Sequence, residues 1–208
     1  MAYPVTVAVE PRLADRNRLT TAFRAILAIP HVFLVGGAGI GLAYNTDSQT
    51  SASAEGGLLG ALVVLLAVVS WCTLVFAGTH IAGIRRLTLF YMHWRVRALA
   101  YLMLLQDAYP PFGDGPYPAT VAVVDPPGPR NRLTVFFRIL LGIPHMIALT
   151  LVMLAWGLGT VVAWFSILFT GRYPQGLYDF SVGALRWRLR FDAYVLLLVD
   201  DYPPFSLR

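Results

Sequence analysis

Two histidines are the residues whose type and position come closest to a site for chemistry. His31 and His145 each follow a proline, in the matching segments AIPH and GIPH, and each lies in an apolar stretch. A pair of histidines inside a membrane could ligate a haem or a metal between helices. Alternatively, each ring bonds to a backbone carbonyl that the proline leaves free, or to a side chain beside the proline kink. We expect this second role, because no acid lies near either histidine in the sequence and bulky neighbours such as Phe33 and Met146 fill the space. No cofactor or metal is predicted.

Clustered arginines form the second candidate site. The motif RNR occupies 16–18 and again 130–132, and another arginine follows each motif. Planar guanidinium groups fit phosphate oxygens, so anionic lipid headgroups are the expected ligands. The alternatives are a pure topology signal or internal pairing with Asp107, Asp200 and Asp201. The predicted lipid-binding residues are Arg16, Arg18, Arg24, Arg130, Arg132 and Arg138.

The sequence contains no recognisable catalytic motif. It has no GxxxxGK phosphate loop, no HExxH, no GxSxG and no CxxC, and Cys72 is its only cysteine. No acidic residue lies within the predicted membrane passes, which argues against a proton relay. We therefore expect a protein that is not an enzyme.

An internal repeat organises the whole chain. Residues 3–31 align without a gap with 117–145, as YPVTVAV and YPATVAV then RNRLT show. Farther along, 94–112 (WRVRALAYLMLLQDAYPPF) aligns with 187–205 (WRLRFDAYVLLLVDDYPPF). The spacing between equivalent residues falls from 114 to 93 because the first copy carries an insertion near 36–56. The chain therefore contains two copies of one unit, assigned to 1–113 and 114–208.

These residues resemble a known family. The pattern YPxxVxV, RNRLTxxFR and IPH, followed by WRxR, AY and YPPF, is similar to the bacterial domain-of-unknown-function 4389 proteins, and it covers nearly the whole chain twice. The resemblance implies a membrane protein, and it brings no catalytic residues to transfer. The copies differ at 79–92, where THIAGIRRLTLFYM replaces RYPQGLYDFSVGAL.

Composition places the chain in a membrane. It is 57% apolar and only 13% charged, against roughly a quarter charged in ordinary soluble domains. All sixteen basic residues are arginine, which together with abundant Ala, Val, Leu and Gly indicates a GC-rich bacterial genome. The excess apolar surface must face lipid.

Each copy is predicted to contain a short strand, a transmembrane helical hairpin and an interfacial amphipathic helix. Alternating apolar residues indicate strands at 5–9 and 120–124, which we expect to pair. Asn17 and Asn131 can each cap the helix that follows. The uncharged runs give the bounds of the transmembrane helices, and the aromatic faces give those of the interfacial helices. These are transmembrane helices at about 22–44 and 57–78, a hairpin at about 135–170, and interfacial helices at about 85–106 and 176–199.

Two hairpins would bring every arginine cluster to one side of the membrane. The positive-inside rule makes that side cytoplasmic. We therefore expect a multi-pass protein of the bacterial inner membrane with both termini in the cytoplasm. Aromatic residues on the interfacial helices are the expected anchors, namely Trp94, Tyr101, Trp187 and Tyr194.

The function we expect is that of a non-enzymatic membrane subunit or scaffold. It would contact anionic lipid headgroups and a protein partner or larger membrane complex, with no role for nucleic acid. A small oligomeric transporter or channel is the first alternative. A haem- or quinone-binding redox subunit that uses His31 and His145 is the second.

Overall fold

Two short strands related by the repeat form the outer layer of the protein. The computed structural model describes residues 3–37, 48–126, 128 and 130–208. Strand β1 (Val5–Val9) pairs antiparallel with β2 (Ala119–Val123), which confirms the predicted pairing. Val7 lies opposite Val121, and these two are equivalent positions of the two copies. A pseudo-two-fold axis therefore passes between them.

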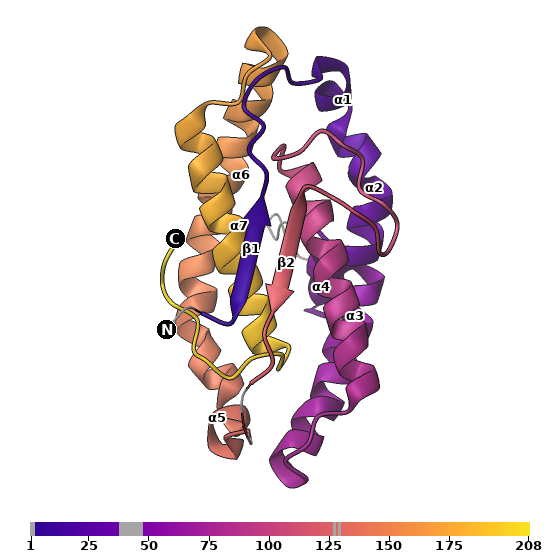
Figure 1. Ribbon diagram of the computed structural model, residues 1–208, viewed down its shortest axis with the longest axis vertical. Helices are drawn as coiled ribbons and strands as arrows, with labels where there is room; N and C mark the ends of the chain where they lie inside the picture. The colour runs from indigo at the N-terminus through magenta and orange to yellow at the C-terminus, as the bar shows by residue number, and fades with distance from the viewer. Residues whose placement is uncertain (1–2, 38–47, 127, 129) are drawn as a thin grey trace.

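Two central helices lie beneath the strands. They are α4 (Ala82–Leu102) and α7 (Gln175–Val195), close to the predicted amphipathic helices. Strand β1 packs on α7 and β2 on α4, as Figure 1 shows, and α4 also contacts α7. Residues 94–101 of α4 are all buried. These helices are therefore the core of the fold, and the prediction that they lie in the membrane interface is wrong.

The second copy contains one long helix where a hairpin was predicted. Helix α6 runs from Arg138 to Thr170 without a break, through Pro144 and past Gly157. At 1.5 Å per residue its 33 residues span about 50 Å. In this stretch a turn would leave backbone groups unpaired among apolar side chains, whereas a continuous helix satisfies them internally. The hairpin at 135–170 is therefore wrong.

The first copy contains the same long helix, interrupted by the insertion. Helix α2 (Arg24–Val35) ends just before Gly36, and α3 (Ser48–Phe76) bends at Gly57, where φ is 67°. A Cβ on Gly57 would lie 2.5 Å from the Gly36 nitrogen, so Gly36 and Gly57, on the two sides of the insertion, are neighbours in space. The predicted passes 22–44 and 57–78 are thus two halves of one rod, and residues 38–44 of the first lie outside the described part. We call α2 with residues 58–76 the first rod, and α6 the second.

A short helix precedes each rod. Asn17 caps α1 (Arg18–Ala22) and Asn131 caps α5 (Arg132–Phe136), as predicted for these asparagines. Each short helix lies against the far end of the other copy's rod. The Trp164 indole donates to the Thr21 carbonyl at 2.9 Å, and Trp71 donates to Val135 at 3.0 Å.

The rods are consequently antiparallel. In Figure 1, α1 and α5 mark opposite ends of the molecule. Arginines flank both ends of each rod, so they do not all gather at one end of the molecule as the two predicted hairpins would require.

Candidate functional site

Most of the predicted lipid-binding arginines lie inside the protein. In the first copy, Arg16 and Arg24 converge on Asp107 in the loop after α4. Arg16 donates to its carboxylate at 3.0 and 2.8 Å, and Arg24 at 2.8 Å. Arg24 also donates to the Tyr101 carbonyl and stacks over that residue's ring at 4.1 Å. The side chains of Arg16 and Arg24 are 0% and 2% exposed, so neither can reach a headgroup.

The second copy repeats this arrangement. Arg130 and Arg138 both pair with Asp200 at 2.8 Å. Arg138 donates to the carbonyls of Tyr194 and Val199, and it lies 4.4 Å from the Tyr194 ring. Each arginine thus holds the end of a central helix against the start of a rod.

Asp107 is ionised by its surroundings. Burial alone would raise the pKa of this carboxyl, but the hydrogen bonds and charge of Arg16, with Asn17 and Arg24, bring the pKa below its ordinary value. A buried carboxylate that accepts several bonds remains charged at neutral pH. Asp107 therefore acts as the anion at the centre of this cluster, in the place that we predicted for lipid phosphate.

Arg18 and Arg132 are the predicted arginines that do face outward. They are equivalent residues, each exposed at the start of its short helix. Their guanidinium groups lie beside Gly171 and Gly78, at the C-terminal ends of the opposite rods. A cation is favourable at the negative end of a helix dipole. Within the part of the chain that is described, neither pairs with a carboxylate.

Arg86 and Arg172 are also exposed, although they were not among the predicted site residues. Arg172 follows α6, at the end where Arg18 lies, and Arg86 is in the first turns of α4, at the end where Arg132 lies. The arginine runs that flank the apolar stretches were the available signal. Each end of the molecule therefore presents a pair of exposed arginines.

The aromatic anchors predicted for the membrane interface are internal. Trp94 and Trp187 are 9% and 7% exposed, and Tyr101 and Tyr194 are each 1% exposed. The helix face that carries them is turned toward the rods. The prediction failed because apolar periodicity indicates that a face is buried without showing whether lipid or protein covers it. As anchors these four residues were predicted wrongly.

Each histidine belongs to an aromatic cluster of its own copy. The Trp94 indole donates to His31 Nδ1 at 3.0 Å, and Trp187 donates to His145 Nδ1 at 3.1 Å. Phe112 and Phe205 from the YPPF segments stack on the rings, with centroids 4.5 and 3.8 Å away. The partner is thus a tryptophan, where we expected a bond beside the proline kink.

This geometry settles the histidine tautomer and what the ring can ligate. An indole nitrogen only donates, so Nδ1 must accept, and in the neutral ring Nε2 carries the proton. The lone pair that a metal would need is the one that the tryptophan uses. Ligation by His31 or His145 would require the indole bond to break, and the two rings occupy separate clusters.

The rods expose apolar side chains along their full length. In α6 one stripe is buried, through His145, Leu149, Met153 and Ile167, and most other positions are exposed. Ile139 and Phe169, near its two ends, are 75% and 77% exposed. Helix α2 and residues 58–76 repeat this pattern. Two helices, Gly56–Phe76 and Arg138–Thr170, are long and apolar enough to cross a membrane.

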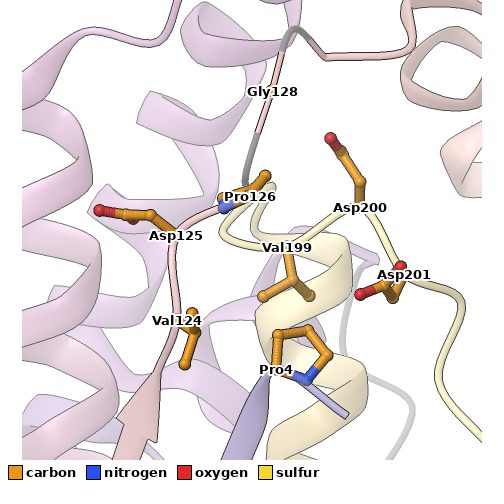
Figure 2. Close-up of a pocket in the computed structure, with 8 residues that line it drawn as sticks. All are labelled: Pro4, Val124, Asp125, Pro126, Gly128, Val199, Asp200 and Asp201. Atoms are coloured by element: carbon orange, nitrogen blue, oxygen red, sulfur yellow. The ribbon is translucent and has the colours of Figure 1, made fainter. Parts of the chain in front are cut away.

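A surface pocket near β2 contains three carboxylates, as Figure 2 shows. Asp200 pairs with Arg130 and Arg138, and Asp125 pairs with Arg85. In the first copy the equivalent position is closed by Gln106, whose amide donates to the Glu10 carbonyl. The pocket therefore reflects a difference between the copies. Among the described residues, these three carboxylates included, no three His, Cys, Asp or Glu side chains are placed so that they could hold a metal ion. The pocket is lined by Pro4, Val124, Asp125, Pro126, Gly128, Val199, Asp200 and Asp201.

The chain belongs to the DUF4389 family, described as a domain of unknown function. The family model matches residues 56–113 and 132–206, one segment in each copy. Comparison with curated proteins gave no match, and neither did comparison with solved structures.

Proposed function

We propose that this protein is a non-enzymatic membrane scaffold. Its two rods sit in hydrocarbon, its exposed arginines contact anionic headgroups, and its strand side binds a protein partner or larger membrane complex. The observation that carries the proposal is the continuous apolar surface of the two rods.

The size of the apolar surface supports a membrane location. Soluble monomers seldom expose contiguous apolar patches above a few hundred Å². Here exposed Leu, Ile, Val and Phe side chains follow both rods, from Phe23 to Phe76 and from Phe136 to Phe169. At about 25 cal/mol for each Å² removed from water, lipid would stabilise this surface strongly.

The arginine pairs at the two ends support contact with lipid headgroups. Arg18 and Arg132 stand next to exposed Leu19 and Leu133, which are 70% and 71% exposed. A guanidinium beside an apolar side chain is the combination that an interface between hydrocarbon and phosphate favours. The inner face of a bacterial membrane is anionic, so we place these residues, with both termini, on the cytoplasmic side.

The strand side supports partner binding. Thr6, Ala8, Thr120 and Ala122 point outward from the paired strands, and all four are exposed. Each strand also has one edge without a neighbouring strand among the described residues. An open edge can accept an added strand from another chain. The partner would be recognised there by backbone pairing.

Membrane extraction tests the proposal on the full-length protein in bacterial cells. We expect the wild type to remain in the membrane pellet after an alkaline carbonate wash. Replacing Leu151, Leu158 and Phe165 with Gln should release a large share of the protein, because these exposed residues of α6 would lose their contact with lipid. The matched control replaces Thr6, Thr120 and Ala122 with Gln and should stay in the pellet. Wild-type protein in the soluble fraction as a stable monomer would overturn the proposal.

Purification in mild detergent tests the partner. A particle mass above that of the chain and its detergent, with a second protein present in fixed ratio, would support a scaffold. Replacement of Val123 by Pro removes an N–H that faces the open edge of β2 and spares the ladder with β1, so it should remove that second protein. Recovery of the chain alone from native membranes would contradict partner binding.

A further inference from the structure

We infer that the two rods lie flat in one leaflet of an anionic membrane and do not cross it. This inference rests on the proposed membrane function and specifies the surface that meets the lipid. The lipid-facing surface is the rod layer, and the strand layer faces water.

The layering of the fold puts apolar and polar groups on opposite sides. Strands β1 and β2 cover one side of α4 and α7, and α2, α3 and α6 pack against the other sides of those helices. The rods are therefore an outer layer, and the strands are the outer layer opposite. A protein whose apolar residues occupy one broad side matches a single leaflet.

Charged groups at the middle of the rods' length argue against crossing. Arg97 pairs with Asp114, and Arg190 donates to the carbonyl of Arg208. The C-terminus lies about halfway along the molecule in Figure 1, and Arg208 lines a surface pocket together with Val9 of β1. If the rods stood upright, these groups would lie near the centre of the bilayer, where charges are costly.

The backbone gives a second argument. An upright molecule would place β1 and β2 at mid-membrane, with an edge of each strand open. Lipid-exposed open edges do not occur in hydrocarbon, because nothing there satisfies the backbone groups. The first rod is also interrupted at its middle, between Gly36 and Gly57. A flat orientation keeps all of these groups near the leaflet surface.

The rods' length and their end charges fit the flat orientation. A helix of about 50 Å exceeds the roughly 30 Å of hydrocarbon that a crossing helix must span. Arg18 and Arg172 lie at one end, and Arg86 and Arg132 at the other. When the rods are flat, both pairs reach headgroups of the same leaflet, and their charge complements an anionic surface.

Labelling from one side tests the orientation. Single cysteines replace Ala14 and Ala82, exposed residues near opposite ends of the molecule, and Thr6 on the strands, in full-length protein that carries Cys72→Ala. An impermeant thiol reagent is applied to intact spheroplasts and to inverted membrane vesicles. We expect all three positions to react in inverted vesicles and none in spheroplasts. Reaction of the cysteines at positions 14 and 82 from opposite sides of the membrane would overturn the flat orientation. It would support a crossing arrangement, such as a small transporter needs.

Depth measurement gives an independent readout. Nitroxide labels at Leu140, Leu154 and Phe165 sample α6 from end to end, in vesicles of phosphatidylcholine with phosphatidylglycerol. We expect the same shallow depth at all three, and full water exposure for a label at Thr120. A deepest point at Leu154 with shallow ends would contradict the inference. Failure of the protein to enter these vesicles would instead contradict the proposed membrane function, so the two failures are distinguishable.

Discussion

Arg95 and Arg188 are equivalent residues of the two copies, and they share one carboxylate. Asp192 accepts from Arg95 Nε at 3.1 Å and from Arg188 Nε at 3.0 Å. The position equivalent to Asp192 in the first copy is Leu99, so the pseudo-symmetry is broken at this point. Asp192, between α4 and α7, therefore pairs with an arginine from each copy.

Replacing Asp192 with Asn should destabilise the protein strongly. Arg95 is 2% exposed at its side chain, and the substitution removes a carboxylate that pairs with it. Breaking a buried ion pair from one side costs about 3–5 kcal/mol. Thermal unfolding in detergent should show a large fall in midpoint. Arg188→Gln is the control and should cost less, because Arg188 is more exposed; equal falls would contradict this account.

Replacing Arg18 and Arg132 with Gln together should weaken binding to anionic vesicles and leave the fold intact. Each exposed arginine contributes roughly 1 kcal/mol at an anionic surface, so losing both should lower the affinity about 30-fold at low salt. Cosedimentation of detergent-free protein with phosphatidylglycerol vesicles measures it. Arg16→Gln tests the distinction: it should lower thermal stability, because that side chain is buried against Asp107. An unchanged affinity in the double variant would show that Arg18 and Arg132 interact with the C-terminal ends of the rods and not with lipid.

Trp94→Phe should cost about 1 kcal/mol of stability by removing the indole bond to His31 while keeping an aromatic ring. His31→Ala should cost more, because it also opens a cavity beneath Phe112. Chemical unfolding in mixed micelles compares the two. Neither variant should change the visible spectrum. A Soret band in the wild type that disappears in His31→Ala and His145→Ala would instead support a haem site.

Lowering the pH should destabilise the first copy, because Asp107 becomes protonated. Its pKa is lowered in the folded state, so its contribution is present above the unfolded pKa, about 4, and is lost as the pH falls through the folded value. The wild-type unfolding midpoint should be nearly constant from pH 7 to about 5 and then fall. Asp107→Asn should start lower at pH 7 and depend less on pH. A parallel pH dependence in the variant would assign the acid sensitivity to other groups.

Local patterns predicted much of the fold. The alternating residues at 5–9 identified β1, and Asn17 and Asn131 identified the starts of α1 and α5, because these features depend on near neighbours. The bounds of α4 and α7 followed from amphipathic periodicity. The repeat also supplied a signal that was not used: removing residues 36–56 aligns Val35 and Gly57 with Leu149 and Thr150, adjacent residues in α6.

Long-range pairing explains what the patterns missed. Arg24 and Asp107 lie 83 residues apart in the chain, and an isolated arginine motif is read as exposed unless its acid is known. The acid before each YPPF segment was the clue, since Asp107 and Asp200 occupy equivalent positions, and pairing with these acids was the alternative to the lipid binding that we expected. The direction of the aromatic face was likewise undetermined, because protein and lipid cover an apolar face equally well.

The strand pairing between Val7 and Val121 has a consequence for the origin of the chain. Because the axis runs between equivalent residues, contacts from one copy to the other can recur in the reverse direction, as the Trp71 and Trp164 bonds illustrate. Such a self-complementary surface is the kind that joins two identical subunits. A chain with a single copy could form the same sheet by pairing with its own twin. Gene fusion of an ancestral homodimer accounts for this molecule, and once the halves were linked, each was free to acquire what the other lacks: the insertion at 36–56 in one and Asp192 in the other.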